Sequence, residues 1–442
     1  MTKRPEQMKL GAFLYPTGHH VAAWRHPDSS EMVTLADFAK LARLAEDAKL
    51  DCLFLADMLS VRLSDPKAAS RRAHSGIAPF EPITLLSALA GMTRNIGLLA
   101  TASTSFNEPY NVARSFQSLN LLSDGRAGWN LVTSSDPEAA FNYGLEQHAL
   151  HQDRYERAEE FIDVVTGLWD SWDTDAFPRD KENGVYFDPA KMHVLNHVGK
   201  HFRVKGPLNL PPSRHGRPLV VQAGGSEPGR NLAARTADLV FAALDDMQAA
   251  IDFCSDMRAR LVRLGRREDS LKVMPGVMVV VGSSRSEAQA KLEQLQELIQ
   301  PEVGLDLLSS LLGADLSGYP IDGPIPELPE SNKGKTRQKV ILDKARRDNL
   351  SIRQLYQHIS GGRGHMQVVG TVAQIADQLQ ERFEAYAADG FNLMAPIFPG
   401  GLVDIVEGVV PELQRRGLFR TEYEGATLRQ NIGLGNEAHR RE

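Results

Sequence analysis

Short apolar segments that end at a polar residue recur along the chain, and each has the composition of a strand buried on both faces. Cys52–Ala56 runs into Asp57, and Leu219–Ala223 runs into two glycines and Ser226. Eight such segments are predicted strands: Lys9–Tyr15, Cys52–Ala56, Ile96–Thr101, Ala127–Val132, Leu219–Ala223, Leu239–Ala243, Val273–Val281 and Leu393–Ile397.

Amphipathic segments with helical periodicity separate these strands. The clearest are Thr34–Lys49, with Thr34 as its N-cap, Asn111–Ser123, Arg154–Trp172, Met247–Leu264 and Ser286–Ile299. This alternation predicts a parallel sheet of the α/β class, and eight strands predict a closed (β/α)8 TIM barrel. Because such barrels collect polar groups at the carboxyl ends of their strands, we expect an enzyme whose active site lies there.

Two long stretches interrupt the alternation. Residues of about 174–218 follow the fourth strand, and residues of about 301–370 follow the seventh. Connections of that length inside a compact domain are typically lids or binding loops, and we interpret the second as an active-site lid with a helix over Asp343–His358. The pattern predicts one barrel domain over residues 1–420 and an extended or oligomer-contacting tail over 421–442.

The composition narrows the range of partners. The chain has 442 residues and a formal net charge of −6, which argues against nucleic acid or an anionic membrane, because both select basic surfaces. The first residues contain no apolar signal core, and no apolar stretch is long enough to span a bilayer, so a cytoplasmic location is expected. Cys52 and Cys254 have no metal-type or redox-type neighbours, which predicts two reduced, packed thiols.

The segment that ends the fifth predicted strand is a candidate phosphate site. Gly224 and Gly225 allow backbone amides to approach a ligand, and Ser226 is the expected N-cap of the following helix. A helix N-terminus attracts a phosphate monoester through its unpaired N–H groups and its dipole. An ordinary strand-to-helix turn with a serine cap explains the same residues.

A second candidate follows the fourth strand. His151 and Tyr155 are four residues apart, so on a helix they share one face and could both reach a ligand in the barrel mouth. The alternative is a charged helix start in which Asp153 is a first-turn acid and Tyr155 is half buried.

The loop after the first strand is a third candidate. Adjacent His19 and His20, with Arg25 nearby, suit a pocket that positions an anion or moves protons, although solvated imidazoles are the alternative. Three further histidines recur every four residues, but Gly199 interrupts any helix there, so no metal site is predicted from His193, His197 and His201.

Several common signatures are absent. The chain contains no G-x-G-x-x-G after a strand, no P-loop and no G-x-S-x-G elbow, so a redox cofactor would be a dissociable one. The remaining motifs resemble the bacterial luciferase-like, reduced-FMN-dependent monooxygenases, specifically the nitrilotriacetate and dibenzothiophene-sulfone branch. The resemblance rests on Gly18–Arg25, Phe54–Asp57, Ala102–Thr104, Pro109–Arg114, Gly125–Ser134, His151–Phe161, Gln222–Ser226, Gly370–Thr371 and Ile375–Leu379.

This resemblance implies a barrel that binds FMN at its carboxyl face. The flavin contacts of the family carry over to Asp57, Thr101, His151, Tyr155 and Ser226. Asn130 is a further candidate for the isoalloxazine edge, and His20 is the predicted catalytic residue, as a substrate-side proton carrier or hydrogen-bond donor. Arg25 is a candidate for recognising a substrate carboxylate.

The implied activity is a two-component one. A separate NAD(P)H-dependent flavin reductase supplies reduced FMN (FMNH2), and the protein excludes water while dioxygen and a small organosulfur or amino-carboxylate substrate react. Oxygenation beside sulfur or nitrogen leads to cleavage of a C–S or C–N bond. Homodimers or homotetramers are expected from the family. The alternatives are a deazaflavin-dependent oxidoreductase on the same barrel and a non-catalytic flavin-binding protein.

Overall fold

One curved, parallel sheet organises the computed structural model, which describes residues 4, 6–61, 65–73, 76–328 and 335–435. Within these residues the sheet has ten strands in the order β11-β10-β12-β1-β2-β3-β4-β7-β8-β9. Their bounds are β1 Lys9–Leu14, β2 Cys52–Leu55, β3 Gly97–Ser103, β4 Ala127–Val132, β7 Leu219–Gln222, β8 Leu239–Val240, β9 Lys272–Val273, β10 Gly276–Val281, β11 Met366–Gly370 and β12 Gly390–Met394. The predicted α/β class with a parallel sheet is confirmed.

Each of the eight predicted strand segments overlaps an observed strand, but two details differ. The predicted strand Val273–Val281 is divided into β9, which pairs with β8, and β10, which pairs with β12; Met274 and Pro275 lie between them. β11, which pairs with β10, was not predicted as a strand. Its residues alternate between buried and half buried, and the run of only five residues lay within the stretch interpreted as a lid.

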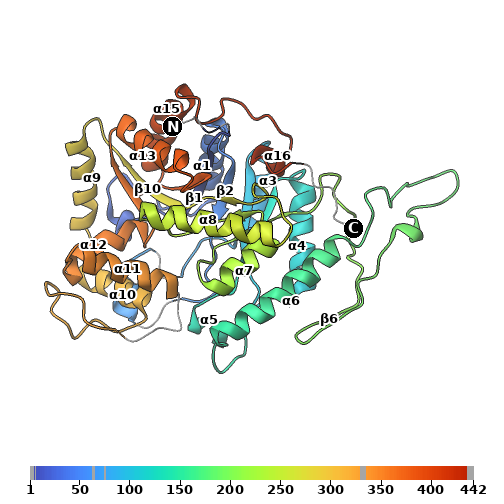
Figure 1. Cartoon of the computed structure of the whole chain (residues 1–442), viewed down its shortest axis with the longest axis horizontal. Helices are drawn as coiled ribbons and strands as arrows, with labels where there is room; N and C mark the ends of the chain where they lie inside the picture. The colour runs from blue at the N-terminus through green and yellow to red at the C-terminus, as the bar shows by residue number, and fades with distance from the viewer. Residues whose placement is uncertain (1–3, 5, 62–64, 74–75, 329–334, 436–442) are drawn as a thin grey trace.

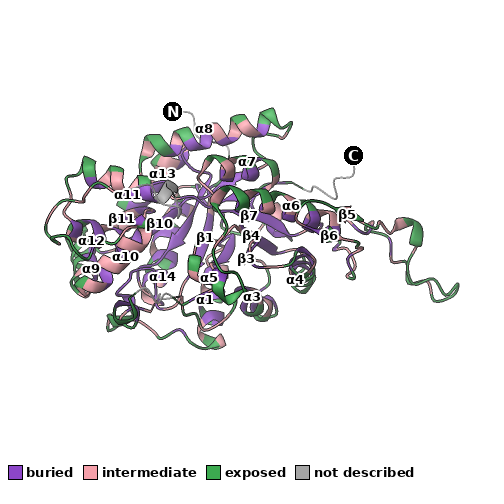
Figure 2. Cartoon of the chain, turned by 90° about the horizontal axis from the view of Figure 1, so that it is seen from below, coloured by how far each residue is buried: buried purple, intermediate pink, exposed green. Residues whose placement is uncertain are grey.

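Helices cover the outer face of the sheet, so that the strands form the buried centre of the molecule (Figures 1 and 2). The α-helices are α1 Leu35–Asp47, α2 Pro66–Ala69, α3 Pro82–Ala90, α4 Pro109–Leu122, α5 Pro137–Asn142, α6 His151–Trp169, α7 Glu227–Thr236, α8 Met247–Arg263, α9 Arg285–Glu297, α10 Pro301–Leu312, α11 Lys335–Arg347, α12 Ile352–Gly362, α13 Val372–Glu384, α14 Gly400–Asp404, α15 Val410–Arg415 and α16 Leu428–Asn431. The chain also forms 3-10 turns at Ala23–Arg25 and Pro189–Lys191 and a π-helical turn at Ile405–Val409.

Two apolar layers hold these elements together. Trp129 of β4 packs outward between the rings of Phe116 and Phe161, which belong to α4 and α6. Phe13, Phe54 and Phe241 meet on the concave side of the sheet, with ring centroids 4.8–5.6 Å apart. Side chains alternate between the two faces of a strand, so every strand contributes to both layers.

The C-terminal segment closes one end of the inner layer. An extended or oligomer-contacting tail was expected over 421–442. The described residues up to 435 include α16, and Leu428 of this helix and the following Ile432 are buried in the same core cluster as Leu99. Gly97 makes this possible, because a Cβ there would lie 2.4 Å from a methyl carbon of Leu428. The apolar residues of this segment are too few to produce a periodic signal in the sequence. Residues 436–442 lie outside the described part.

The two long stretches between strands have different structures. Residues after α6 form a short antiparallel pair, β5 His197–Val198 and β6 Arg203–Val204, in a segment that projects from the body of the molecule (Figure 1). The predicted helix Asp343–His358 is two helices, α11 and α12. Asn349 has a left-handed φ of 48°, and Ser351 starts α12 with a capping box, so the chain turns between them.

Candidate active site

A cavity of about 450 Å³ opens where β4, β7 and β8 end. This volume falls in the range of about 300–1,000 Å³ that is typical of cofactor sites. The chain after β4 and after β7 forms two sides, and Ser310 and Leu311 of α10 contribute a third. His365, which follows α12, completes the lining together with Phe241.

The turn after β7 combines a helix cap with a close approach of backbone. The Ser226 hydroxyl accepts a hydrogen bond from the Gly229 N–H at 3.3 Å and begins α7. A Cβ on Gly224 would lie 3.0 Å from the Cα of Gly229 and 3.2 Å from the hydroxyl oxygen of Tyr155. Ser226 and the N-terminus of α7 therefore meet Tyr155 at one wall of the cavity, where the helix dipole favours an anion.

The first turn of α6 supplies the facing side chains. His151 and Tyr155 both line the cavity, and their ring centroids are 4.8 Å apart. Arg154 lines it as well, although its residue exposure is only 3%. Positions i, i+3 and i+4 share one helix face, which is why the three side chains converge.

Arg154 carries a positive charge that the protein does not neutralise. One guanidinium nitrogen donates to the Ala149 carbonyl at 2.7 Å, and the buried Nε has no partner. None of the described carboxylates forms an ion pair with it, and burial lowers the pKa of Arg154. A buried cation without a counter-ion is costly, so an anion in the cavity would stabilise it.

Thr101 and Asn130 form a buried pair on neighbouring strands. The Thr101 hydroxyl donates to the Leu55 carbonyl at 2.7 Å and accepts from the Asn130 amide at 2.8 Å. The other amide atom of Asn130, Oδ1, is buried without a partner, and so is Nε2 of Gln222, which lines the cavity. The structure thus leaves one acceptor and one donor of adjacent strands unused.

Asp57 and His20 lie outside the lining of the cavity. Asp57 follows β2, where burial and then the charge of Glu81 raise its pKa to about 6. His20 is fully buried, and both ring nitrogens are engaged, Nε2 with the Ser360 hydroxyl at 2.9 Å and Nδ1 with the Ala22 N–H at 3.3 Å. Burial and then the charge of Arg363 lower the pKa of His20 to about 3. Its catalytic role stays a prediction.

Other candidates have simpler environments. Arg25 is exposed, and its guanidinium donates to the Leu298 carbonyl. The three spaced histidines face three separate carboxylates, His193 with Asp173, His197 with Glu160 and His201 with Glu156. Within the described ranges no group of three or more histidine, cysteine, aspartate or glutamate side chains is placed to hold a metal ion. The described helices also include none with both the length and the hydropathy that crossing a bilayer requires.

Comparison with known sequences identifies the family of the chain that forms this cavity. The sequence profile of the luciferase-like monooxygenases matches residues 12–389. The chain belongs to this family. The predicted family and the predicted enzyme class, a monooxygenase, are therefore confirmed.

Individual luciferase-like monooxygenases match along nearly the whole chain. N-acetyl-S-(2-succino)cysteine monooxygenase of Bacillus subtilis (strain 168) is 49% identical over 446 residues, covering 100% of this chain and 99% of that protein. Component A of nitrilotriacetate monooxygenase from Aminobacter aminovorans is 48% identical, with 97% of each chain covered. Among solved structures, riboflavin lyase with modified FMN and riboflavin superposes with a TM-score of 0.89 at 32% identity, covering 98% of both chains.

Arg154, Gln222 and His365 line the cavity but were not identified as site residues from the sequence. Arg154 stands between His151 and Tyr155 and shares their helix face, so helical spacing alone could have identified it. Gln222 is the last residue of β7, and Thr101 lies near the end of β3. The expectation that polar residues at the carboxyl ends of strands reach the active site applies to Gln222 as it did to Thr101. His365 follows α12 and precedes a strand that was not predicted, so no sequence signal indicated that it reaches the cavity.

The raised pKa of Asp57 predicts a pH-dependent stability. The folded pKa of about 6 exceeds the ordinary value of 3.8, so the folded protein binds this proton more tightly than the unfolded chain does. The stabilisation is present at low pH and is lost as pH rises from about 4 through 6. We expect Asp57→Asn to increase the free energy of unfolding by about 2 kcal/mol at pH 7.5 and by less at pH 5. Urea unfolding at the two pH values measures this, and an equal difference at both would contradict the raised pKa.

Proposed function

We propose that this monooxygenase holds reduced FMN in the cavity at the ends of β4, β7 and β8 and uses it with dioxygen to oxidise a small polycarboxylate. The observation that carries the proposal is the buried side chain of Arg154, which has no counter-ion among the described residues and lines the same cavity as the Ser226 cap. A phosphate monoester supplies the anion that both features lack, because charged hydrogen bonds are about twice as strong as neutral ones.

The residues present fit FMN along its length. Ser226, Arg154, Tyr155 and His151 would hold the phosphate. The unused Oδ1 of Asn130 and Nε2 of Gln222 offer an acceptor and a donor for the N–H and carbonyl edge of the isoalloxazine. We retain Asp57 and Thr101 as further flavin contacts, on the resemblance to the family. The modified FMN in the structure of riboflavin lyase, which is 32% identical to this chain, supports the choice of cofactor.

We propose further that the sheet closes as an eight-stranded barrel, with residues 272–281 serving as one strand that includes β9 and β10. On one side Met274 N–H bonds to Val240 at 2.8 Å. On the other side the Pro275 carbonyl accepts from Asn392 at 2.9 Å. These bonds support continuity between β8 and β12, which leaves β11 outside the ring.

The substrate class follows from the two relatives at 48% and 49% identity, whose names describe tricarboxylates built on a thioether and on an amine. We propose N-acetyl-S-(2-succino)cysteine or a closely similar compound. Insertion of one oxygen atom into the C–H bond beside sulfur gives a hemithioketal, while the second oxygen atom leaves as water. The hemithioketal breaks its C–S bond to a thiol and a ketone. The corresponding amine would lose its C–N bond in the same way.

The protein's own part is binding, orientation and exclusion of water. Leu311 of α10 and Phe241 contribute apolar surface to the lining, which would displace water from the reacting groups once cofactor and substrate are bound. Bound reduced FMN supplies the electrons that activate dioxygen. We propose that a separate NAD(P)H-dependent flavin reductase delivers it in the cytoplasm.

The test is anaerobic mixing of the protein with reduced FMN, followed by oxygenated buffer containing N-acetyl-S-(2-succino)cysteine or nitrilotriacetate. We expect one dioxygen consumed for each thiol or secondary amine released, and a smaller release of hydrogen peroxide than from free reduced FMN. Oxidation at the rate of free flavin with no product would favour a non-catalytic flavin-binding protein. Anaerobic hydride transfer between a substrate and an added deazaflavin, with no product formed from reduced FMN and dioxygen, would favour the deazaflavin-dependent alternative.

A further inference from the structure

Arg363 occupies a strained turn next to the cavity. It is the residue after α12 and has a left-handed φ of 50°, followed by Gly364 with a φ of 88°. The Gly362 carbonyl accepts from the His365 N–H at 2.8 Å, which closes the turn. Left-handed backbone is uncommon for a residue other than glycine, asparagine or aspartate, and it persists where the surroundings enforce it. The same turn places His365 in the wall of the cavity.

The Arg363 side chain lies among neutral groups. Its guanidinium carbon is 4.9 Å from the centre of the Tyr15 ring, and one nitrogen reaches the His19 carbonyl at 3.5 Å. Its Nε is buried without a partner. Among the described residues no carboxylate lies within 4.0 Å of the guanidinium, so this cation has no counter-ion in the protein.

The two histidines beside Arg363 do not share its charge. Burial, and then the charge of Arg363, lower the pKa of both His19 and His20 to about 3, so both rings are neutral at pH 7. Arg363 is therefore the cation of this part of the carboxyl face. Arg154 is the cation of the flavin cavity and belongs to a different element. The two sites are connected through Phe241, which stacks on His365 with ring centroids 4.7 Å apart and lines the cavity.

We propose that Arg363, rather than Arg25, recognises a carboxylate of the substrate. The unpaired guanidinium supplies a planar donor set that matches a carboxylate. Tyr15 lies against the guanidinium and restricts its orientation. This inference rests on the proposed function, because it assigns the substrate side of the same active site.

The test compares an acid with its neutral ester. Binding of N-acetyl-S-(2-succino)cysteine and of its trimethyl ester to the full-length protein is measured by calorimetry, with wild type, Arg363→Met, Arg363→Lys and Arg25→Gln. We expect the wild type to prefer the acid, and Arg363→Met to weaken acid binding about 30-fold while ester binding stays unchanged. Arg363→Lys should restore part of the loss, since it retains the charge without the planar donors. Arg25→Gln should bind like the wild type.

Two results would overturn the assignment of Arg363. One is equal binding of acid and ester by the wild type, and the other is an equal loss for both ligands in Arg363→Met. Oxygen consumption with reduced FMN is recorded in the same samples. An Arg363-dependent preference for the acid without substrate oxidation would contradict the proposed function alone. Substrate oxidation that survives Arg363→Met with unchanged KM would contradict the assignment of Arg363 alone.

Discussion

Replacement of Arg154 by methionine should weaken the binding of reduced FMN about 100-fold while leaving reduced riboflavin nearly unaffected. Arg154 is only 3% exposed as a residue and has no carboxylate partner among the described residues, so the FMN phosphate would be its counter-ion. Riboflavin lacks the phosphate and cannot make this contact. Anaerobic titration of the protein with each reduced flavin, followed by absorbance, gives the two dissociation constants and their ratio.

Arg157 provides the matched control for this experiment. It lies on the same helix as Arg154, one turn further along, and its guanidinium packs 4.3 Å from the centre of the Phe202 ring, outside the lining of the cavity. Arg157→Met removes the same charge and should leave the preference for FMN over riboflavin unchanged. If Arg154→Met weakens both flavins equally, the residue supports the shape of α6 and does not bind the phosphate.

The parts of this site that could be predicted are those fixed by local geometry. His151 and Tyr155 are four residues apart and therefore share one face of α6. Ser226 follows a strand and two glycines, a pattern that predicts the N-cap it forms on α7. Each of these signals lies within ten residues of sequence. The three side chains meet in one cavity, which is also what parallel strands with a common carboxyl edge require.

The parts that could not be predicted depend on residues far apart in the chain. His20 was chosen for its place after β1, but Ser360, 340 residues away, engages its ring. Arg363 gains its environment only because α12 ends beside Tyr15. Leu428 is buried because Gly97 leaves space for it. Neither the spacing nor the composition of a segment records such contacts, so the sequence alone did not indicate Arg363 as a candidate.

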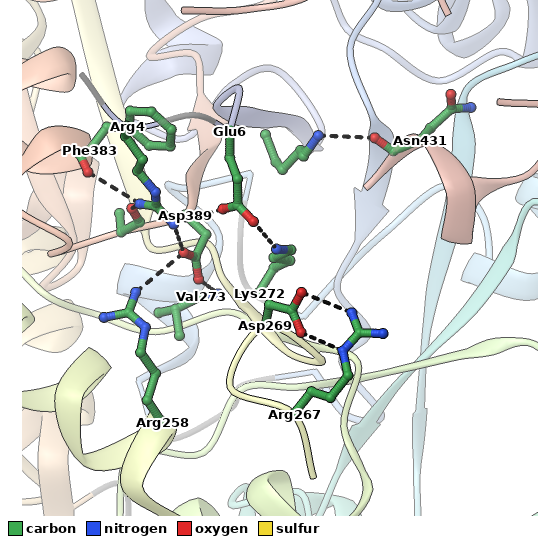
Figure 3. A network of polar contacts seen from close by, with 12 residues as sticks. Arg4, Glu6, Arg258, Arg267, Asp269, Lys272, Val273, Phe383, Asp389 and Asn431 are labelled. Atoms are coloured by element: carbon green, nitrogen blue, oxygen red, sulfur yellow. Dashed lines mark hydrogen bonds and ion pairs between the residues drawn. The ribbon is translucent and has the colours of Figure 1, made fainter. Parts of the chain in front are cut away.

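The second large effect, on stability, is expected at the amino ends of the strands, away from the cavity at their carboxyl ends. Asp389, which precedes β12, accepts from the Val273 N–H at 2.8 Å and forms ion pairs with Arg4 and with Arg258, the latter at 3.4 Å (Figure 3). Its side chain is 8% exposed. Asp389→Ala would leave Arg258 and the buried Val273 N–H without this partner, and would leave Arg4 with Glu6 as its remaining ion-pair partner at 3.1 Å. We expect a loss of about 3–5 kcal/mol in the free energy of unfolding, measured by urea denaturation at pH 7.5.

A neighbouring, exposed ion pair shows whether the loss of stability in Asp389→Ala comes from the burial of Asp389 or from its charge alone. Arg267 and Asp269 are joined at 2.8 Å in the same view, but their side chains are 64% and 47% exposed (Figure 3). Asp269→Ala should therefore cost less than about 1 kcal/mol, because solvent screens an exposed pair. Asp389→Asn should fall between the two, since it can still accept from Val273 but loses the ion pairs. Equal losses for Asp269→Ala and Asp389→Ala would show that Asp389 does not hold the start of β12 to β9 and the N-terminal segment.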